Sequence, residues 1–88
     1  MSYDTTQKKI RLVETCRACP EQYEAFIGDE QVGYLRLRHG IFRVDYPDCG
    51  GETIYRVEPK GDGCFMEEER DFYLNKAIEA INNKINHP

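Results

Sequence analysis

The chain has 88 residues, which is enough for one small domain with a single modest core. Hydrophobic residues make up 40% and charged residues 32% of the chain, a composition that excludes an intrinsically disordered protein. The net charge of −4 argues against a dedicated nucleic-acid-binding protein, because such proteins usually carry a strong basic excess. We expect one domain over residues 1–88, in which residues 1–8 form a loose tail.

Five segments alternate apolar and polar residues with the period of a β-strand. They are residues 9–15, 22–27, 31–38, 41–46 and 53–58. Short links separate them, and His39-Gly40 has the length and the glycine of a tight hairpin turn. The pattern predicts an antiparallel meander of four to five strands.

From about residue 66 the hydrophobic period changes to that of an α-helix. Leu74, Ile78, Ile81 and Ile85 form one apolar stripe, with Ala77 beside them. Glutamates at 67–69 fall in the first helical turn, where the helix dipole favours negative charge, and we expect them to be solvated. The predicted fold is therefore α+β, with one C-terminal helix packed on one face of the meander.

The predicted compartment is the cytosol. Residues 1–9 contain no apolar run of the kind that a signal peptide requires. No segment approaches the roughly 18 apolar residues of a membrane span, so we expect no membrane partner. Thiols stay reduced in the cytosol, where cysteines more often bind metals or catalyse reactions than form disulfides.

Four cysteines form the strongest motif in the chain. Cys16 and Cys19 make a C-x-x-C pair, and Cys49 and Cys64 each lie beside glycines. A two-residue gap lets both thiolates turn toward one ion, and the glycines let the backbone fold tightly around it. This predicts a structural zinc site, with Zn²⁺ bound by Cys16, Cys19, Cys49 and Cys64 at about 2.3 Å. Zinc binding would add on the order of 10 kcal/mol to the free energy of unfolding, which is more than the net stability that a core of this size provides by itself.

Three alternatives to the four-cysteine site remain open. In a simple meander alternate links lie at the same end of the sheet, which would group Cys16, Cys19 and Cys64 with His39 and leave Cys49 at the other end. The glycine knuckle at residues 46–50 favours the four-cysteine set instead. The thiols can also be unrelated buried side chains, or Cys16 and Cys19 a thioredoxin-like dithiol, although no βαβ unit surrounds them.

The sequence shows no catalytic constellation. His39 and His87 are too few and too scattered for a general base beside a nucleophile. The glycines near residues 61–63 lack the lysine of a phosphate-binding loop. We therefore expect a protein that is not an enzyme and has no small-molecule substrate.

Alternation places four arginines on the sheet face opposite the helix: Arg36, Arg38, Arg43 and Arg56. Tyr34, Ile41 and Ile54 are expected to interleave with them. Arginine with aromatic side chains can bind phosphates and stack bases, and the same composition marks protein–protein hot spots. The alternative is a cross-strand ladder of charge pairs with the acidic residues nearby, namely Glu24, Asp45 and Glu58. The candidate partner surface consists of Tyr34 and the four arginines.

The stretch CPEQYEAFIGDEQVGYLRLRHGIFRVDYPDCGGETIYRVEPKGDGCF, about half of the chain, resembles small proteins of phages and prophages from gut bacteria. The short, acidic, cysteine-bearing chain is similar to the zinc-containing anti-CRISPR inhibitors of the type II CRISPR nuclease. Those inhibitors share no motif, so the resemblance assigns no residue a role. It implies an inhibitor in the host bacterial cytosol that docks on the nuclease and hinders guide-RNA or target-DNA loading.

Three functions follow as expectations. The first is a non-enzymatic zinc-binding module that binds another protein, with the type II CRISPR nuclease as the partner implied by the resemblance. The alternative is a zinc-dependent nucleic-acid-binding module that uses Arg36, Arg38, Arg43 and Arg56. The third is a thiol oxidoreductase based on Cys16 and Cys19.

Overall fold

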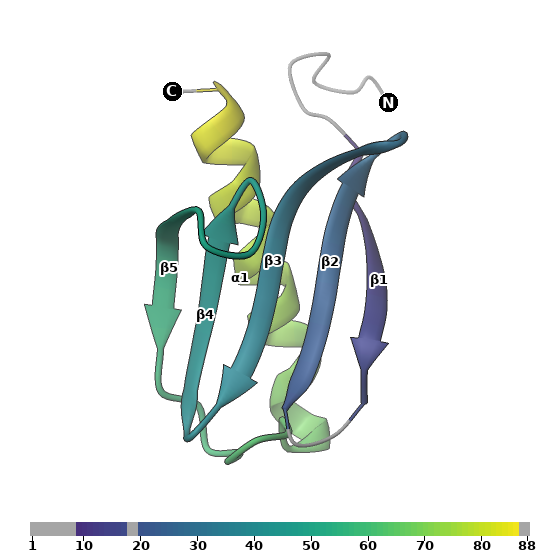
Figure 1. Ribbon diagram of the computed structural model, residues 1–88. Coiled ribbons are helices and arrows are strands. Elements are labelled where there is room, and N and C mark those ends of the chain that lie inside the picture. The colour runs from purple at the N-terminus through teal and green to yellow at the C-terminus, as the bar shows by residue number, and fades with distance from the viewer. Residues whose placement is uncertain (1–8, 18–19, 87–88) are drawn as a thin grey trace, which may run out of the picture.

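The computed structural model describes residues 9–17 and 20–86. These residues form one antiparallel sheet with the strand order β1-β2-β3-β4-β5, and the helix α1 lies across one of its faces (Figure 1). The elements are β1 (Arg11–Cys16), β2 (Glu21–Ile27), β3 (Glu30–Arg38), β4 (Ile41–Tyr46), β5 (Glu52–Val57) and α1 (Glu67–Asn86). The predicted α+β meander is thus confirmed, and each strand begins and ends within two residues of its expected position. Among the described residues, no helix is both long enough and apolar enough to cross a membrane.

The core lies between the sheet and α1. Every second residue of the central strands points toward the helix, as the two-residue period of a strand requires. The fully buried members are Ala25, Leu35, Leu37, Phe42 and Val44 from the sheet, and Ala77 and Ile81 from α1. Burial of a large aliphatic or aromatic side chain contributes about 1.5–3 kcal/mol, so this layer holds the helix on the sheet.

The helix buries a narrower face than the predicted stripe. Ala77 and Ile81 are fully buried, and Leu74 and Ile85 pack against the core at its margin. Ile78 lies outside the core and borders a surface hollow with Asn75 and Glu79, which corrects its predicted place. Of the predicted stripe, Ile78 is the residue furthest from the fully buried Ile81, about 60° around the helix axis.

A buried carboxylate fastens the start of α1 to the sheet. The Glu21 side chain is 0% exposed and accepts hydrogen bonds from the Phe65 amide at 3.0 Å, from Arg70 Nε at 2.8 Å and from the Tyr23 hydroxyl. Burial alone would raise the pKa of the Glu21 carboxyl, but these hydrogen bonds outweigh burial and hold the pKa below its ordinary value. Burial and the neighbouring carboxylate raise the pKa of the Tyr23 hydroxyl, which therefore stays protonated as a donor.

A second buried carboxylate organises the loop between β5 and α1. Glu69 was expected to be solvated, but its side chain is buried. Its carboxylate accepts hydrogen bonds from the backbone amides of Lys60 at 2.9 Å, Gly61 at 2.8 Å and Met66 at 2.9 Å. Burial opposes ionisation, yet the three amides together hold the pKa of Glu69 below its ordinary value. The loop is closed from the other side by the Glu21 amide, which donates to the Gly63 carbonyl at 2.8 Å.

Close packing between β3 and α1 predicts a steric effect at Gly33. A Cβ at this position would lie 2.6 Å from Cδ1 of Ile81, which is closer than side chains pack. We expect Gly33→Ala to lower the free energy of unfolding by about 1–3 kcal/mol, as overpacking does. Ile81→Val removes the clashing methyl group, so urea unfolding of the double variant should show less destabilisation than the sum of the two single changes. Strict additivity would contradict this packing.

Candidate functional site

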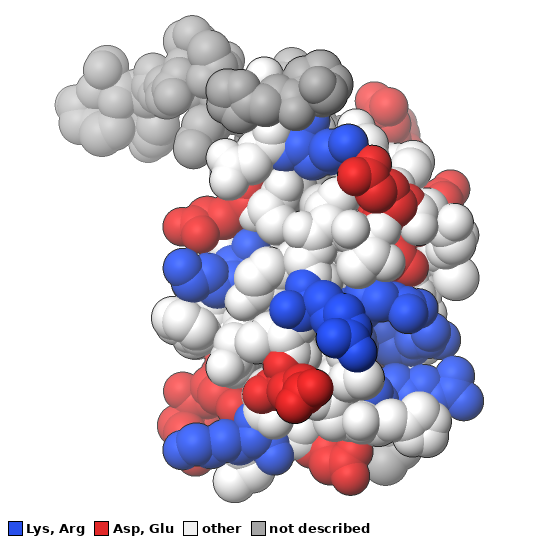
Figure 2. All heavy atoms as spheres, turned by 90° about the vertical axis from the view of Figure 1, so that its left-hand side faces the viewer, with Lys and Arg blue, Asp and Glu red and all other residues white. Residues whose placement is uncertain are grey.

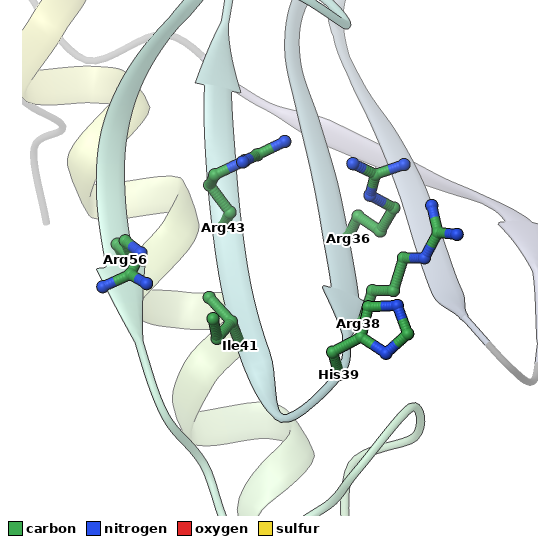
Figure 3. A pocket seen from close by; sticks show the side chains of 6 residues that line it. All are labelled: Arg36, Arg38, His39, Ile41, Arg43 and Arg56. Atoms are coloured by element: carbon green, nitrogen blue, oxygen red, sulfur yellow. The ribbon is translucent and has the colours of Figure 1, made fainter.

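The face of the sheet opposite α1 carries a row of arginines. Arg36 of β3 lies directly opposite Arg43 of β4, and Arg43 lies directly opposite Arg56 of β5. Figure 3 shows these side chains on the side of the sheet away from the helix. Because neighbouring strands are about 4.8 Å apart, this arginine row (Arg36, Arg43 and Arg56) spans about 10 Å across three strands.

A surface hollow of about 260 Å³ lies along the arginine row. Arg38 at the end of β3, His39 in the turn and Ile41 at the start of β4 complete its lining (Figure 3). We call it the arginine hollow. Its lining presents guanidinium groups, one imidazole and one aliphatic side chain, and it contains no carboxylate.

The charges in this row are mostly uncompensated. Like charges directly opposite one another across a sheet are unfavourable. Arg43 Nε lies 3.5 Å from Oδ1 of the buried Asp45. Within residues 9–17 and 20–86, Arg36, Arg38 and Arg56 form no ion pair.

The expected cross-strand ladder does not form among the described residues, because the pair of Arg43 and Asp45 lies within the single strand β4. The other two acidic residues named for it, Glu24 and Glu58, make no ion pair with a described residue. The remaining guanidinium groups therefore have no anionic partner among residues 9–17 and 20–86.

Charge is unevenly distributed over the molecule. Figure 2, a view onto the β5 edge, shows its largest group of lysine and arginine side chains at the middle and right, with acidic and further basic residues above and below. The exposed acids Glu67, Glu68 and Asp71 belong to α1, on the other side of the sheet. The net charge of −4 thus describes the whole chain and not this face, where arginine dominates.

Two other residues predicted for this face behave differently. Tyr34 lies there, its hydroxyl donating to Gln22 Oε1 at 3.0 Å and its ring 5.8 Å from the Arg36 guanidinium carbon. Ile54 does not: it packs against the core and borders a hollow with Ala80 of α1. A register shift between β4 and β5 pairs Asp45 with Thr53 and leaves Ile54 unpaired, so strict alternation fails at that point.

A second hollow, of about 330 Å³, continues around the end of the sheet from the arginine hollow. We call it the end hollow, and it is lined by Pro20, Arg38, His39, Asp62 and Gly63. Arg38 and His39 line both hollows, so the two are adjacent. Pro20 and Asp62 were missed in the sequence, because no local pattern indicates that two loops 42 residues apart meet beside one turn.

The structure separates Cys49 from the cysteines at the other end of the sheet. Cys64 Sγ lies 3.6 Å from the Arg17 carbonyl oxygen, next to Cys16 at the end of β1, whereas Cys49 is exposed in the loop between β4 and β5 (Figure 1). Cys19 lies outside the described residues. A simple five-strand meander puts the first and fourth links at opposite ends, so Cys49 lies away from Cys16 and Cys64.

Over the described ranges, no group of three or more histidine, cysteine, aspartate or glutamate side chains is placed to hold a metal ion. His39 lies at the end that carries Cys64, beside Gly63 in the end hollow. Among the described side chains named in the sequence, the fold therefore brings Arg36, Arg43 and Arg56 into one row and places Cys49 and Cys64 at opposite ends of the sheet.

No family model, curated protein or solved structure matches this chain. The chemistry of the site follows from its own residues. Guanidinium groups donate hydrogen bonds and carry permanent charge but accept no protons, so the arginine row can bind anions without catalysing proton transfer.

Proposed function

We propose that the protein is a non-enzymatic nucleic-acid-binding module that holds the phosphates of a single strand on the arginine row. The observation that carries this proposal is the direct cross-strand register of Arg36, Arg43 and Arg56. Folding brings these like charges together and leaves two of the three without an ion pair among the described residues. A partner with regularly spaced negative charges offsets that repulsion when it binds.

A single nucleic-acid strand fits this face better than an acidic protein surface does. Its backbone repeats one charge per nucleotide, and the planar fork of arginine matches phosphate oxygens. Its unpaired bases can lie against side chains of an open sheet, where Tyr34 supplies an aromatic ring. Carboxylates on a folded protein have no such repeat, so an acidic protein is the outcome that competes with this proposal.

The salt dependence of binding tests the proposal. With three to four phosphate contacts, the logarithm of affinity for a single strand should fall against the logarithm of salt concentration with a slope of about −2 to −3. Fluorescence anisotropy with a labelled seven-nucleotide RNA measures that slope. Absence of binding at low salt, or equal competition by poly-glutamate, would refute nucleic acid as the partner.

The second candidate is the inhibitor function implied by the resemblance to anti-CRISPR proteins. The arginine row supports it indirectly, because a face that binds a single strand can compete for guide RNA while the protein is docked on the type II nuclease. A pull-down against that nuclease, combined with a cleavage assay, tests it. No binding and undiminished cleavage would exclude this partner.

We further propose that zinc, bound by Cys16, Cys19 and Cys64, stabilises the end of the sheet that carries Cys16 and Cys64. The C-x-x-C spacing supports this, as does the contact between Cys64 and the Arg17 carbonyl. Thiolates and an imidazole such as that of His39 are ligands that Zn²⁺ prefers. Native mass spectrometry before and after acid treatment should show the loss of one zinc, with Cys49→Ser unchanged in zinc content. A protein that carries no zinc when purified without chelator would contradict the proposal.

A further inference from the structure

We infer that the end hollow is a nucleobase pocket that selects guanine through the carboxylate of Asp62. This inference rests on the proposed function, because the arginine row would place the neighbouring phosphate. Arg38 and His39 line both hollows, so a nucleotide whose phosphate lies in one has its base within reach of the other.

Asp62 has the chemistry to recognise one base. Its side chain is exposed and makes no hydrogen bond or ion pair with any described residue, although it lies within a hollow that also contains Arg38. A carboxylate has two acceptor oxygens and no donor. Guanine alone presents two parallel N–H donors, from its ring nitrogen and its amino group, on one edge. Adenine, cytosine and uracil each offer a single donor group there, so a bidentate pair distinguishes guanine from the others.

The walls of the hollow suit a flat ring. His39 and Arg38 are planar groups of the kind that stack on unpaired bases, and Pro20 adds an apolar wall. The volume of about 330 Å³ corresponds to roughly eleven water molecules, which is room for a base with its sugar. The lining therefore combines stacking planes with one hydrogen-bonding edge.

The loop that carries Asp62 is held in place before any ligand arrives. The residues on both sides of Asp62 are fastened, Gly61 by its amide to Glu69 at 2.8 Å and Gly63 by its carbonyl to the Glu21 amide at 2.8 Å. A Cβ at Gly61 would lie 1.9 Å from the Cys64 carbonyl oxygen, so the backbone is tightly folded there. A side chain on a fixed loop loses little entropy on binding, which favours a recognition role for Asp62.

The turn between β3 and β4 places the imidazole beside both hollows. His39 has φ 56° and Gly40 has φ 76°, the conformation of a type I′ turn. Asn-Gly is the commonest pair at such a turn, and histidine is among the few non-glycine residues enriched at positive φ. The backbone thus accommodates His39 there, in the lining of both hollows.

Anisotropy titrations with five seven-nucleotide probes test the inference. Each is UUUXUUU, with guanine, inosine, adenine, cytosine or uracil at X. We expect the guanine probe to bind about tenfold more tightly than the uracil probe, the size of a good bidentate base contact. Inosine lacks the amino group and should lose most of that preference. Asp62→Asn should bring the guanine-to-uracil ratio close to one.

The ratio of affinities is the decisive readout, because the loss of negative charge at Asp62 by itself would strengthen binding of all five probes equally and leave their ratio unchanged. Asp48→Asn, an exposed aspartate in the loop at the opposite end of the sheet, is the matched control and should keep the preference. Unfolding midpoints for both variants should equal that of the unmodified protein. Equal binding of all probes by the unmodified protein, or a preference that survives Asp62→Asn, overturns the inference and leaves the proposed function intact. Failure to bind any probe at low salt overturns the proposed function itself.

Discussion

Replacing Arg36, Arg38 and Arg56 together with glutamine is expected to weaken binding of single-stranded RNA about 100-fold at low salt. These are the arginines of the two hollows that make no ion pair within the described chain, and Arg43 keeps its partner Asp45. At roughly 1 kcal/mol for each phosphate contact, three contacts correspond to a loss of this size. The salt slope should also fall by about 2, since each contact with a single strand contributes about 0.7.

Stability should change in the opposite direction to affinity. The triple variant relieves the like-charge oppositions on both sides of Arg43, each unfavourable by about 0.2–1 kcal/mol, so its free energy of unfolding should equal or exceed that of the unmodified protein.

The matched control for the loss of RNA affinity is a second triple variant, Lys9→Gln, Arg11→Gln and Lys76→Gln. It also removes three positive charges and changes the net charge from −4 to −7. Equal loss of affinity in the control would mean that net charge, and not the row, binds RNA.

Glu21→Gln is expected to have the largest effect on stability, lowering the free energy of unfolding by about 3–5 kcal/mol. Every group bonded to the Glu21 carboxylate is a donor, and the amide NH₂ of glutamine cannot accept from them. Breaking a buried pair leaves the Arg70 guanidinium without its main partner. The total free energy of unfolding of a small domain is about 5–15 kcal/mol, so this variant should lose much of its stability. Urea unfolding at pH 7 measures the difference.

Glu67→Gln is the matched control for this effect. Glu67 Oε1 also lies 2.9 Å from the Arg70 guanidinium, but its side chain is 90% exposed, so the change should be within about 0.5 kcal/mol. A loss as large as that of Glu21→Gln would contradict the assignment of the effect to burial.

The effect of Glu21→Gln should also depend on pH. Because the folded-state pKa of Glu21 lies below its ordinary value of 4.5, its stabilisation is fully present above that value and disappears as pH falls through the lower folded pKa. The difference between the variant and the unmodified protein should therefore be largest at neutral pH and narrow at pH 3. A difference that does not change with pH would refute the depressed pKa of this carboxyl.

Local sequence patterns carried most of the fold. Alternation over residues 31–38 and 41–46 and the glycine of the His39-Gly40 turn identified the central hairpin, because strand periodicity and turn conformation depend on neighbouring residues. Local patterns failed to predict burial where a side chain is buried by contact with a segment distant in the sequence. Nothing in the run Glu67-Glu68-Glu69 distinguishes its buried third member from the two exposed ones. The three backbone amides that donate hydrogen bonds to its carboxylate come within reach only after the loop and α1 have folded together.

The candidate site divides in the same way. The sequence by itself determined that Arg36, Arg38, Arg43 and Arg56 share the face opposite the helix, since a strand alternates its side chains whatever its neighbours are. Only the tertiary structure decided that three of these arginines lie directly opposite one another on neighbouring strands. It also decided that Asp62 and His39 line one hollow and that Cys49 lies away from Cys64. Register and strand order are set by pairing between strands and by packing against α1, and those interactions join residues that no local pattern connects.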